Sequence, residues 1–299
     1  MRLLESLGWQ MKTQGSHNKI LLINEFREYC KQAAFSENAS SDSIAYIFCE
    51  YFQINKHELH ASTKTITKKQ ISALKRMMED HFFGKPAQYV VKKTYFYEDE
   101  FYSPEGVFIP RPETELLIDI IKNDFDALAE LKITEACIGT GCIALSLSSI
   151  FKNATIVGYD NSPEAVRVAK TNANILKKDN VRFFLKDVLK VQIRKANIFV
   201  CNPPYIPLTE IERLDKNVKE FEPHHALTDF QNGISFYLHF ANNIGNILFK
   251  KGTAYFELPA NRFNAEIIAS FQKIPYSKIE LFNDYNSKER FLKIQINRP

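Results

Sequence analysis

The sequence has 299 residues, of which 45% are hydrophobic and 25% charged, a composition typical of soluble globular proteins and not of disordered or fibrous chains. No apolar run approaches the ~20 residues of a membrane span, and the first residues lack the apolar core of a secretory signal peptide. The net charge of +4 is mild, so it allows a nucleic-acid or ribosome-associated partner without indicating one.

The cysteines and histidines do not suggest a metal site. The five cysteines form an odd set without a Cys-x-x-Cys pair, so we expect reduced thiols and a cytoplasmic protein, with the mitochondrial matrix as the other compartment that fits. His57 and His60 are three residues apart, but no cysteine or third ligand is near them in the sequence. We therefore expect no bound metal.

Residues 1–84 predict a small helical domain. Apolar residues recur at helical spacing in 22–34, 44–52 and 71–83. The segment Thr67-Lys68-Lys69-Gln70 fits a capping box before the last of these helices, and Gly84 with Pro86 fits its end.

Residues 85–110 predict a β-hairpin that joins this domain to the rest of the chain. Aromatic and β-branched residues between 94 and 109 are interrupted by Ser103-Pro104-Glu105-Gly106, which we interpret as the turn between two short strands.

Residues 111–299 predict an α/β domain, because apolar runs alternate with amphipathic stretches as they do in βαβ units with a parallel sheet. The predicted strands are 132–137, 155–159, 181–185, 197–201 and 253–258, followed by a terminal antiparallel pair at 278–283 and 291–296.

The segment Asn202-Pro203-Pro204-Tyr205 is the strongest candidate for catalysis, because it stands where a buried strand ends in a loop. The side-chain oxygen of Asn202 and the carbonyl of Pro203 can each accept one N–H of an amide or exocyclic amine, which orients this weakly nucleophilic nitrogen toward an electrophile. Tyr205 offers a flat face to a planar group. The alternative is a strand-terminating Pro-Pro turn with a packed tyrosine.

A second candidate site follows the first predicted strand of the sheet. The turn Cys137-Ile138-Gly139-Thr140-Gly141 precedes a helix, and Asp160 ends the next strand, an arrangement that commonly holds a nucleoside by the backbone and by a carboxylate on the ribose. Asp187 follows the third strand. Alternatively, the glycines permit close packing of helix on strand and Asp160 caps a helix.

On these residues the chain resembles the S-adenosylmethionine-dependent methyltransferases, and specifically the protein-(glutamine-N5) methyltransferases that modify peptide-chain release factors. The segments 109–115 and 221–227, with Asn232-Gly233, are similar to further segments of that family. The resemblance implies a Rossmann-like class I methyltransferase sheet of seven mostly parallel strands, with S-adenosylmethionine as cofactor. It also implies methyl transfer to the glutamine of the Gly-Gly-Gln loop of a release factor.

The same resemblance implies roles for individual residues and for the helical domain. Cys137 to Gly141 would surround the methionine part of the cofactor, Asp160 would hold its ribose, Asp187 and Val188 would border the adenine, and Asn202 would face both cofactor and substrate amide. The helical domain would dock the release factor. The chain would act as a monomer, without stable binding to nucleic acid or to a membrane.

Four residues depart from the family pattern. Cys137 replaces a usual glycine, Ile138 a small polar residue and Val188 a frequent aromatic, so we expect an effect on cofactor affinity and none on the class of reaction. Asn286 stands where glycine is common, and asparagine tolerates a left-handed turn.

Other functions remain open at this point. A ribosomal-protein glutamine methyltransferase cannot be separated from the first reading, whereas a DNA or RNA amino-methyltransferase acting on a flipped adenine would need a basic cleft. An NAD-dependent oxidoreductase would fit the glycine turn, but no proton donor stands out near Asn202. A non-catalytic binding protein would keep the fold without using Asn202.

Overall fold

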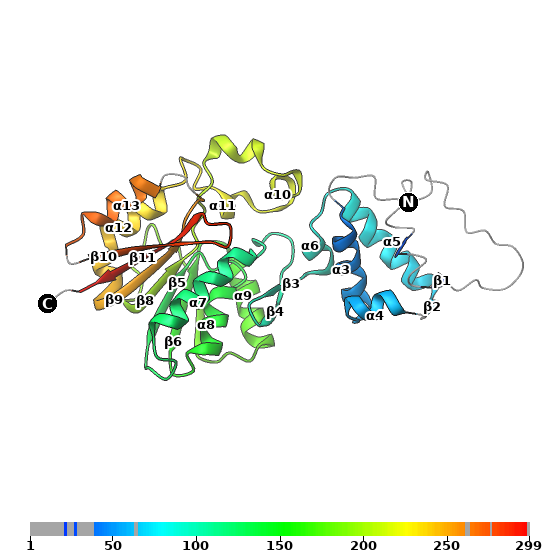
Figure 1. The fold of residues 1–299 in the computed structure, drawn as a ribbon, viewed down its shortest axis with the longest axis horizontal. Helices are drawn as coiled ribbons and strands as arrows, with labels where there is room; N and C mark the ends of the chain where they lie inside the picture. Colours follow the sequence, from blue (N-terminus) through cyan, green and yellow to red (C-terminus); the bar gives the residue numbers. More distant parts are fainter. Residues whose placement is uncertain are drawn as a thin grey trace, which may run out of the picture. The chain divides into compact units, whose positions relative to one another are not determined.

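The computed structural model describes residues 21–22, 27–28, 39–62, 65–260, 264–275 and 277–297. The chain divides into two compact units (Figure 1). The helical unit comprises Met1–Lys92 and Asp215–Phe221, and the sheet unit comprises Lys93–Leu214 and Glu222–Pro299. In the described part of the chain, no helix is long and apolar enough to cross a membrane.

The helical unit is built on short amphipathic helices with one small core. Its buried residues include Ile44, Phe48, Leu74 and Met78. The helices are α3 (Ser41–Phe52), α4 (Lys56–Ala61), α5 (Lys68–Phe82), α6 (Ala87–Val91) and α10 (Lys216–Phe221), and the strands β1 (Leu21–Leu22) and β2 (Thr65–Ile66) pair antiparallel.

The helices predicted at 44–52 and 71–83 are confirmed, and so is the capping box. The Thr67 hydroxyl accepts the Gln70 N–H, and the Gln70 side chain accepts the Thr67 N–H at 2.9 Å. The helix predicted at 22–34 lies mostly outside the described residues, and Leu22 belongs to β1.

The seven-stranded sheet of the other unit has the order β10-β11-β9-β8-β5-β6-β7. The five strands β9, β8, β5, β6 and β7 run parallel, and β11 and β10 at the other end are antiparallel to their neighbours, which confirms the predicted α/β class and the antiparallel pair. The bounds are β5 (Lys132–Ala136), β6 (Thr155–Asp160), β7 (Val181–Leu185), β8 (Ala196–Cys201), β9 (Leu248–Glu257), β10 (Ser277–Asn283) and β11 (Glu289–Ile296).

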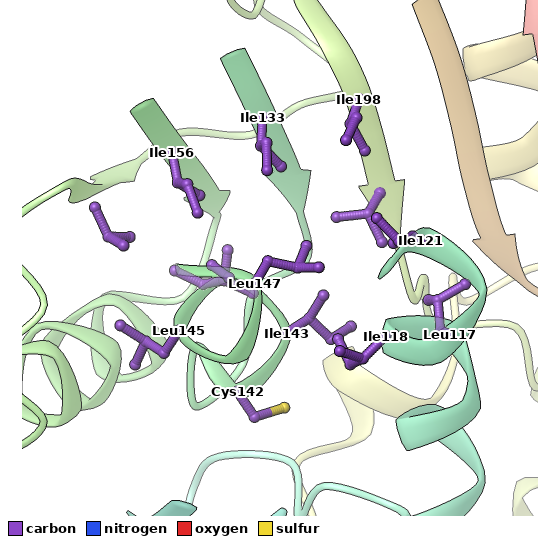
Figure 2. Packing of buried hydrophobic residues seen from close by; sticks show 14 of the residues in the cluster. Leu117, Ile118, Ile121, Ile133, Cys142, Ile143, Leu145, Leu147, Ile156 and Ile198 are labelled. Atoms are coloured by element: carbon purple, nitrogen blue, oxygen red, sulfur yellow. The ribbon is translucent and has the colours of Figure 1, made fainter. Parts of the chain in front are cut away.

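Helices cover both faces of this sheet (Figure 1). On one face lie α7 (Glu115–Asp124), α8 (Cys142–Ile150) and α9 (Pro163–Ile175), and on the other α12 (Ser235–Ile247) and α13 (Asn264–Gln272). Figure 2 shows the first core, where Ile133, Ile156 and Ile198 of three strands face α7 and α8. Along β8, Ile198 and Val200 belong to this core while Phe199 and Cys201 belong to the other, as strand alternation requires.

The hairpin is present, but its turn was predicted at the wrong residues. Strands β3 (Lys93–Phe96) and β4 (Asp99–Tyr102) pair with Phe96 opposite Asp99, so the turn is Tyr97-Glu98, with Tyr97 at φ +57°. Two-residue turns of this kind usually carry asparagine or glycine, which is why the sequence did not mark this one. The predicted turn, Ser103 to Gly106, follows β4, and its first two residues are buried.

A second turn, near the C-terminus, has its left-handed residue one position away from the expected one. Between β10 and β11 the residue at φ +58° is Ser287, so the expectation for Asn286 was wrong. The Asp284 side chain accepts the N–H groups of Asn286 and Lys288 at 2.9 and 3.0 Å, and it thereby closes the turn. An Asx turn of this type holds the backbone without glycine.

His81 links the end of α5 to the start of α3 inside the helical unit. Its Nδ1 lies 2.9 Å from the Lys85 carbonyl oxygen, to which it must donate, and its Nε2 lies 2.7 Å from the Ser43 hydroxyl. The neutral ring therefore donates on one side and accepts on the other. Burial lowers the pKa of His81, although its bond to the Lys85 carbonyl opposes this shift.

We expect the helical unit to lose stability as the pH falls below the ordinary histidine pKa of 6.5. The fold holds His81 neutral, whereas the unfolded chain binds a proton on this ring, so protons favour unfolding. Urea unfolding near pH ~7.5 and pH ~5.5, followed by circular dichroism, measures the effect. His81→Gln should show a shallower pH dependence than the wild type; equal dependence in both would refute this role.

Candidate active site

A cavity at the carboxyl edge of the parallel strands collects most of the predicted site residues. Its open space is about 1030 Å³, including solvent at the mouth. Gly141 is not part of its wall and forms the left-handed N-cap of α8. The wall contains eleven of the predicted residues, namely Cys137, Ile138, Gly139, Thr140, Asp160, Asp187, Val188, Asn202, Pro203, Pro204 and Tyr205.

Asp160 ends β6 and fastens the glycine turn. Its Oδ2 accepts the Gly139 N–H at 3.1 Å, and its Oδ1 accepts the Ser162 N–H at 2.9 Å. The cap of α9 is Ser162, whose hydroxyl accepts the Ala165 N–H, so Asp160 is not the helix cap. Burial raises the pKa of Asp160, and these N–H groups oppose the shift. The carboxylate is thus held at the cavity wall.

The cavity wall has unsatisfied polar atoms. Glu135 is 1% exposed, and its Oε2 accepts the Ala144 N–H at 2.9 Å. Its Oε1 and the Thr140 hydroxyl are buried without a partner among the described residues. Space is open where a Cβ on Gly139 would stand. Because buried polar groups normally have partners, these atoms and this opening fit a polar ligand that approaches the backbone closely.

Asp187 and Val188 form the wall after β7. The Asp187 carboxylate accepts the Leu189 N–H at 3.0 Å and pairs with Lys190 at 2.9 Å. Burial alone would raise the pKa of Asp187, but these hydrogen bonds lower it below its usual value. Val188 is buried in the second core.

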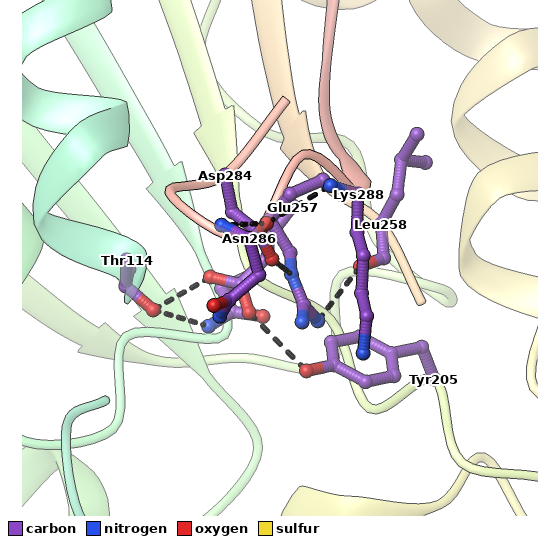
Figure 3. Close-up of polar contacts among 9 residues, drawn as sticks. Thr114, Tyr205, Glu257, Leu258, Asp284, Asn286 and Lys288 are labelled. Atoms are coloured by element: carbon purple, nitrogen blue, oxygen red, sulfur yellow. Dashed lines mark hydrogen bonds and ion pairs between the residues drawn. The ribbon is translucent and has the colours of Figure 1, made fainter. Parts of the chain in front are cut away.

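The catalytic candidate segment lies at the end of β8, and two residues from distant parts of the chain contact it (Figure 3). Asn202 Nδ2 is 3.5 Å from the Thr114 hydroxyl, and the Tyr205 hydroxyl donates to Glu257 Oε1 at 3.2 Å. Thr114 ends a short 3-10 turn (Pro112–Thr114), and Glu257 ends β9. Sequence reasoning did not identify Thr114 or Glu257 as site residues.

The loop after Tyr205 is held by the last residue of α11 (His224–Leu227) and by the segment that follows this helix. The Ile206 N–H donates to the Leu227 carbonyl and the Leu208 N–H to the Gln231 carbonyl, both at 2.9 Å. A Cβ on Gly233 would collide with the Tyr205 carbonyl oxygen. Glycine is therefore required at Gly233, which explains why the Asn232-Gly233 pair accompanies the catalytic segment.

Arg111 and Glu222 join the two other segments that the sequence singled out. Glu222 is buried, and its carboxylate accepts hydrogen bonds from the Arg111 guanidinium and from the Ile109 N–H. The guanidinium also lies over the Phe108 ring, 4.6 Å from its centre. Burial raises the pKa of Glu222, and Arg111 opposes this shift. This pair therefore holds in place the chain segment that leads to Thr114.

Comparison with known proteins places the chain in a family. Residues 100–217 match the family described as methyltransferase small domain. The release factor glutamine methyltransferase of Bacillus subtilis is 33% identical over 270 residues, which cover 88% of this chain and 92% of that protein. That of Flavobacterium psychrophilum is 31% identical over 285 residues, which cover 92% and 99%. The chain belongs to the release factor glutamine methyltransferase family.

Membership of the release factor glutamine methyltransferase family identifies the chain as a methyltransferase, in place of the NAD-dependent and non-catalytic alternatives. The described residues contain no group of three or more His, Cys, Asp or Glu side chains able to hold a metal ion. Thr114 could have been suspected, because it lies within the segment 109–115 that carries the family resemblance. Glu257 is separated from Tyr205 by 52 residues, and nothing in the local sequence marked it.

Cys137 adopts the conformation that explains the usual glycine at its position. It stands at φ +60°, and its N–H donates to the Tyr159 carbonyl at 2.9 Å. A left-handed residue with a Cβ costs roughly 1–2 kcal/mol. Ile138 beside it is buried in the first core.

We expect Cys137→Gly to be more stable than Cys137→Ala by about 1 kcal/mol. Both variants lose the sulfur atom, so their difference isolates the Cβ in a left-handed conformation. Urea unfolding of the two proteins under the same conditions measures it. A glycine variant that is no more stable than the alanine variant would contradict the strain assigned to this turn.

Proposed function

We propose that this protein transfers a methyl group from S-adenosylmethionine to the side-chain amide nitrogen, N5, of the glutamine in the Gly-Gly-Gln loop of peptide-chain release factors. The observation that carries this proposal is the shared cavity: Asn202-Pro203-Pro204-Tyr205 and the Gly139–Asp160 pair both line it. The names of the relatives, from bacteria as different as Bacillus subtilis and Flavobacterium psychrophilum, support the same substrate.

The cavity has the groups that S-adenosylmethionine would need. Asp160 would accept the ribose hydroxyls, the turn at Gly139 would lie against the methionine part, and Asp187 with Val188 would border the adenine. The free Oε1 of Glu135 and the Thr140 hydroxyl are further polar groups for this ligand. When bound, the cofactor would supply an electrophilic methyl group to the amide nitrogen, and the electron pair of the carbon–sulfur bond would stay on the sulfur.

The catalytic segment would hold the glutamine amide for that reaction. Asn202 Oδ1 would accept one N–H and the Pro203 carbonyl the other, so that the nitrogen lone pair points into the cavity. Pro203 and Pro204 fix the backbone of this loop. The Tyr205 ring would pack on the planar amide. A strong base is unnecessary, because the nitrogen can release its proton to solvent after it has been alkylated.

We also propose that the helical unit docks the release factor. The described residues that line the cavity all belong to the sheet unit, so no described residue of the helical unit is among them. Phe83, at the end of α5, is 62% exposed, so its ring is accessible to a protein partner.

Mass spectrometry of a release factor incubated with this protein and S-adenosylmethionine tests the proposed reaction. We expect the mass of one methyl group on the glutamine of the Gly-Gly-Gln loop, and no gain when this glutamine is replaced by alanine. A ribosomal-protein fraction and an adenine-containing oligonucleotide serve as competing substrates. Methylation of either of these, with an unmodified release factor, would refute the proposed substrate.

Asn202→Ala tests the role of the catalytic segment. We expect turnover to fall by roughly 100-fold or more, because the amide loses its positioned acceptor. Binding of S-adenosylhomocysteine, measured by calorimetry, should change little. A variant with normal turnover, or one that loses binding of S-adenosylhomocysteine to the same extent, would show that Asn202 does not act on the substrate amide.

Phe83→Ser tests the docking role of the helical unit. We expect the KM for the whole release factor to rise several-fold, because the lost contact costs about 1 kcal/mol of binding free energy. The KM for a short Gly-Gly-Gln peptide should stay unchanged. Steady-state kinetics with the two substrates measure this difference. Equal effects on both substrates, or on neither, would argue against docking through this residue.

A further inference from the structure

The carboxylate of Glu257 binds two side chains, that of Thr114, which contacts the catalytic segment, and that of Tyr205, which belongs to it (Figure 3). Glu257 is 2% exposed. The Thr114 hydroxyl donates to its Oε2 at 2.6 Å, and the Tyr205 hydroxyl donates to its Oε1 at 3.2 Å. A carboxylate accepts and does not donate, so the direction of both bonds is fixed.

The direction of the Thr114 bond determines how the Asn202 amide is turned. A hydroxyl has one proton, and that of Thr114 goes to Glu257. The Thr114 oxygen can therefore only accept from Asn202, and the atom 3.5 Å away must be the amide nitrogen Nδ2. If the amide were reversed, two acceptor oxygens would face each other. Oδ1 is thus directed away from Thr114 and is available to accept an N–H of the substrate.

Surrounding groups hold Glu257 in place and offset part of the cost of its burial. The Tyr237 hydroxyl donates to the Glu257 backbone carbonyl at 2.6 Å, which holds the end of β9. Burial raises the pKa of Glu257, while the Thr114 and Tyr205 hydroxyls and the positive charge of Arg290 oppose this shift. Arg290 is itself held by Asp284 at 3.3 Å and by the Leu258 carbonyl at 3.5 Å. Both side-chain oxygens of Glu257 and its backbone carbonyl thus have fixed partners.

We propose that Thr114 and Glu257 are positioning residues for methyl transfer: through one buried carboxylate they set the orientation of the Asn202 amide and the position of the Tyr205 ring. This inference rests on the proposed function, since it assigns Asn202 Oδ1 to the substrate amide. It also gives the segment 109–115 a role in the reaction, because Thr114 reaches the amide that receives the substrate. Neither residue needs to touch the substrate for this effect.

The test compares Thr114→Val, which keeps the shape and loses the hydroxyl, with Thr114→Ser, which keeps the hydroxyl. We expect kcat for release factor methylation to fall roughly 10- to 100-fold in the valine variant, with KM and S-adenosylhomocysteine affinity within about twofold of wild type. The serine variant should recover most of kcat. Thr171→Val is the matched control, since that hydroxyl donates to the Arg167 carbonyl of its own helix and should leave kcat unchanged.

Two kinetic outcomes would overturn the inference. A valine variant with wild-type kcat would show that the hydroxyl does not matter, and equal losses in the valine and serine variants would show a packing effect. If Thr114→Val does not fold, Glu257→Gln takes its place. Its side chain offers one acceptor oxygen where two are used, so kcat should again fall while S-adenosylhomocysteine still binds.

A readout without substrate separates this inference from the proposed function. We expect the NMR signals of the Asn202 side-chain amide protons to show slow exchange with solvent in the wild type and in Thr114→Ser, and faster exchange in Thr114→Val. Unchanged signals in all three would overturn the inference. If the wild type shows this pattern but methylates no release factor, the proposed function fails and the positioning of Asn202 stands.

Discussion

The candidate active site of this methyltransferase depends on the parallel alignment of five strands, β7, β6, β5, β8 and β9. Parallel strands end at the same edge, so residues that follow them in sequence meet in space although they are tens of residues apart. Asp160, Asn202 and Glu257 stand at the ends of three such strands. A shift of one strand by a residue would turn these side chains toward the wrong face, so the two apolar cores that fix the register also fix the site.

Buried carboxylates are the common element of that edge. Glu135, Asp160, Glu222 and Glu257 are all buried well enough for their pKa values to be raised. Leaving such a group without partners would cost several kcal/mol, and each one accepts at least one hydrogen bond. Asp160 holds the glycine turn, Glu222 holds Arg111, and Glu257 holds Thr114 and Tyr205. The carboxylates therefore connect the cavity wall to the segments that surround it.

The sequence predicted the sheet well because inner strands such as β5 and β8 are buried on both faces and appear as continuous apolar runs, as in 198–201. It predicted two turns at the wrong residues, because Tyr97 and Ser287 take left-handed conformations that glycine or asparagine usually signals. The residues at strand ends could be named from their position in the pattern. The contact of Thr114 with Asn202, 88 residues away, depends on tertiary packing that no local pattern shows.

The central claim is that Asn202, held by Thr114, accepts the substrate amide at the end of β8. A crystal structure with S-adenosylhomocysteine and a Gly-Gly-Gln peptide would test it most directly. The account predicts the glutamine nitrogen within hydrogen-bond distance of Asn202 Oδ1 and of the Pro203 carbonyl, with Asn202 Nδ2 facing the Thr114 hydroxyl. The sulfur of S-adenosylhomocysteine should face the glutamine nitrogen across the space that the methyl group would occupy. A glutamine amide bound elsewhere in the cavity, or an Asn202 amide turned the other way, would contradict it.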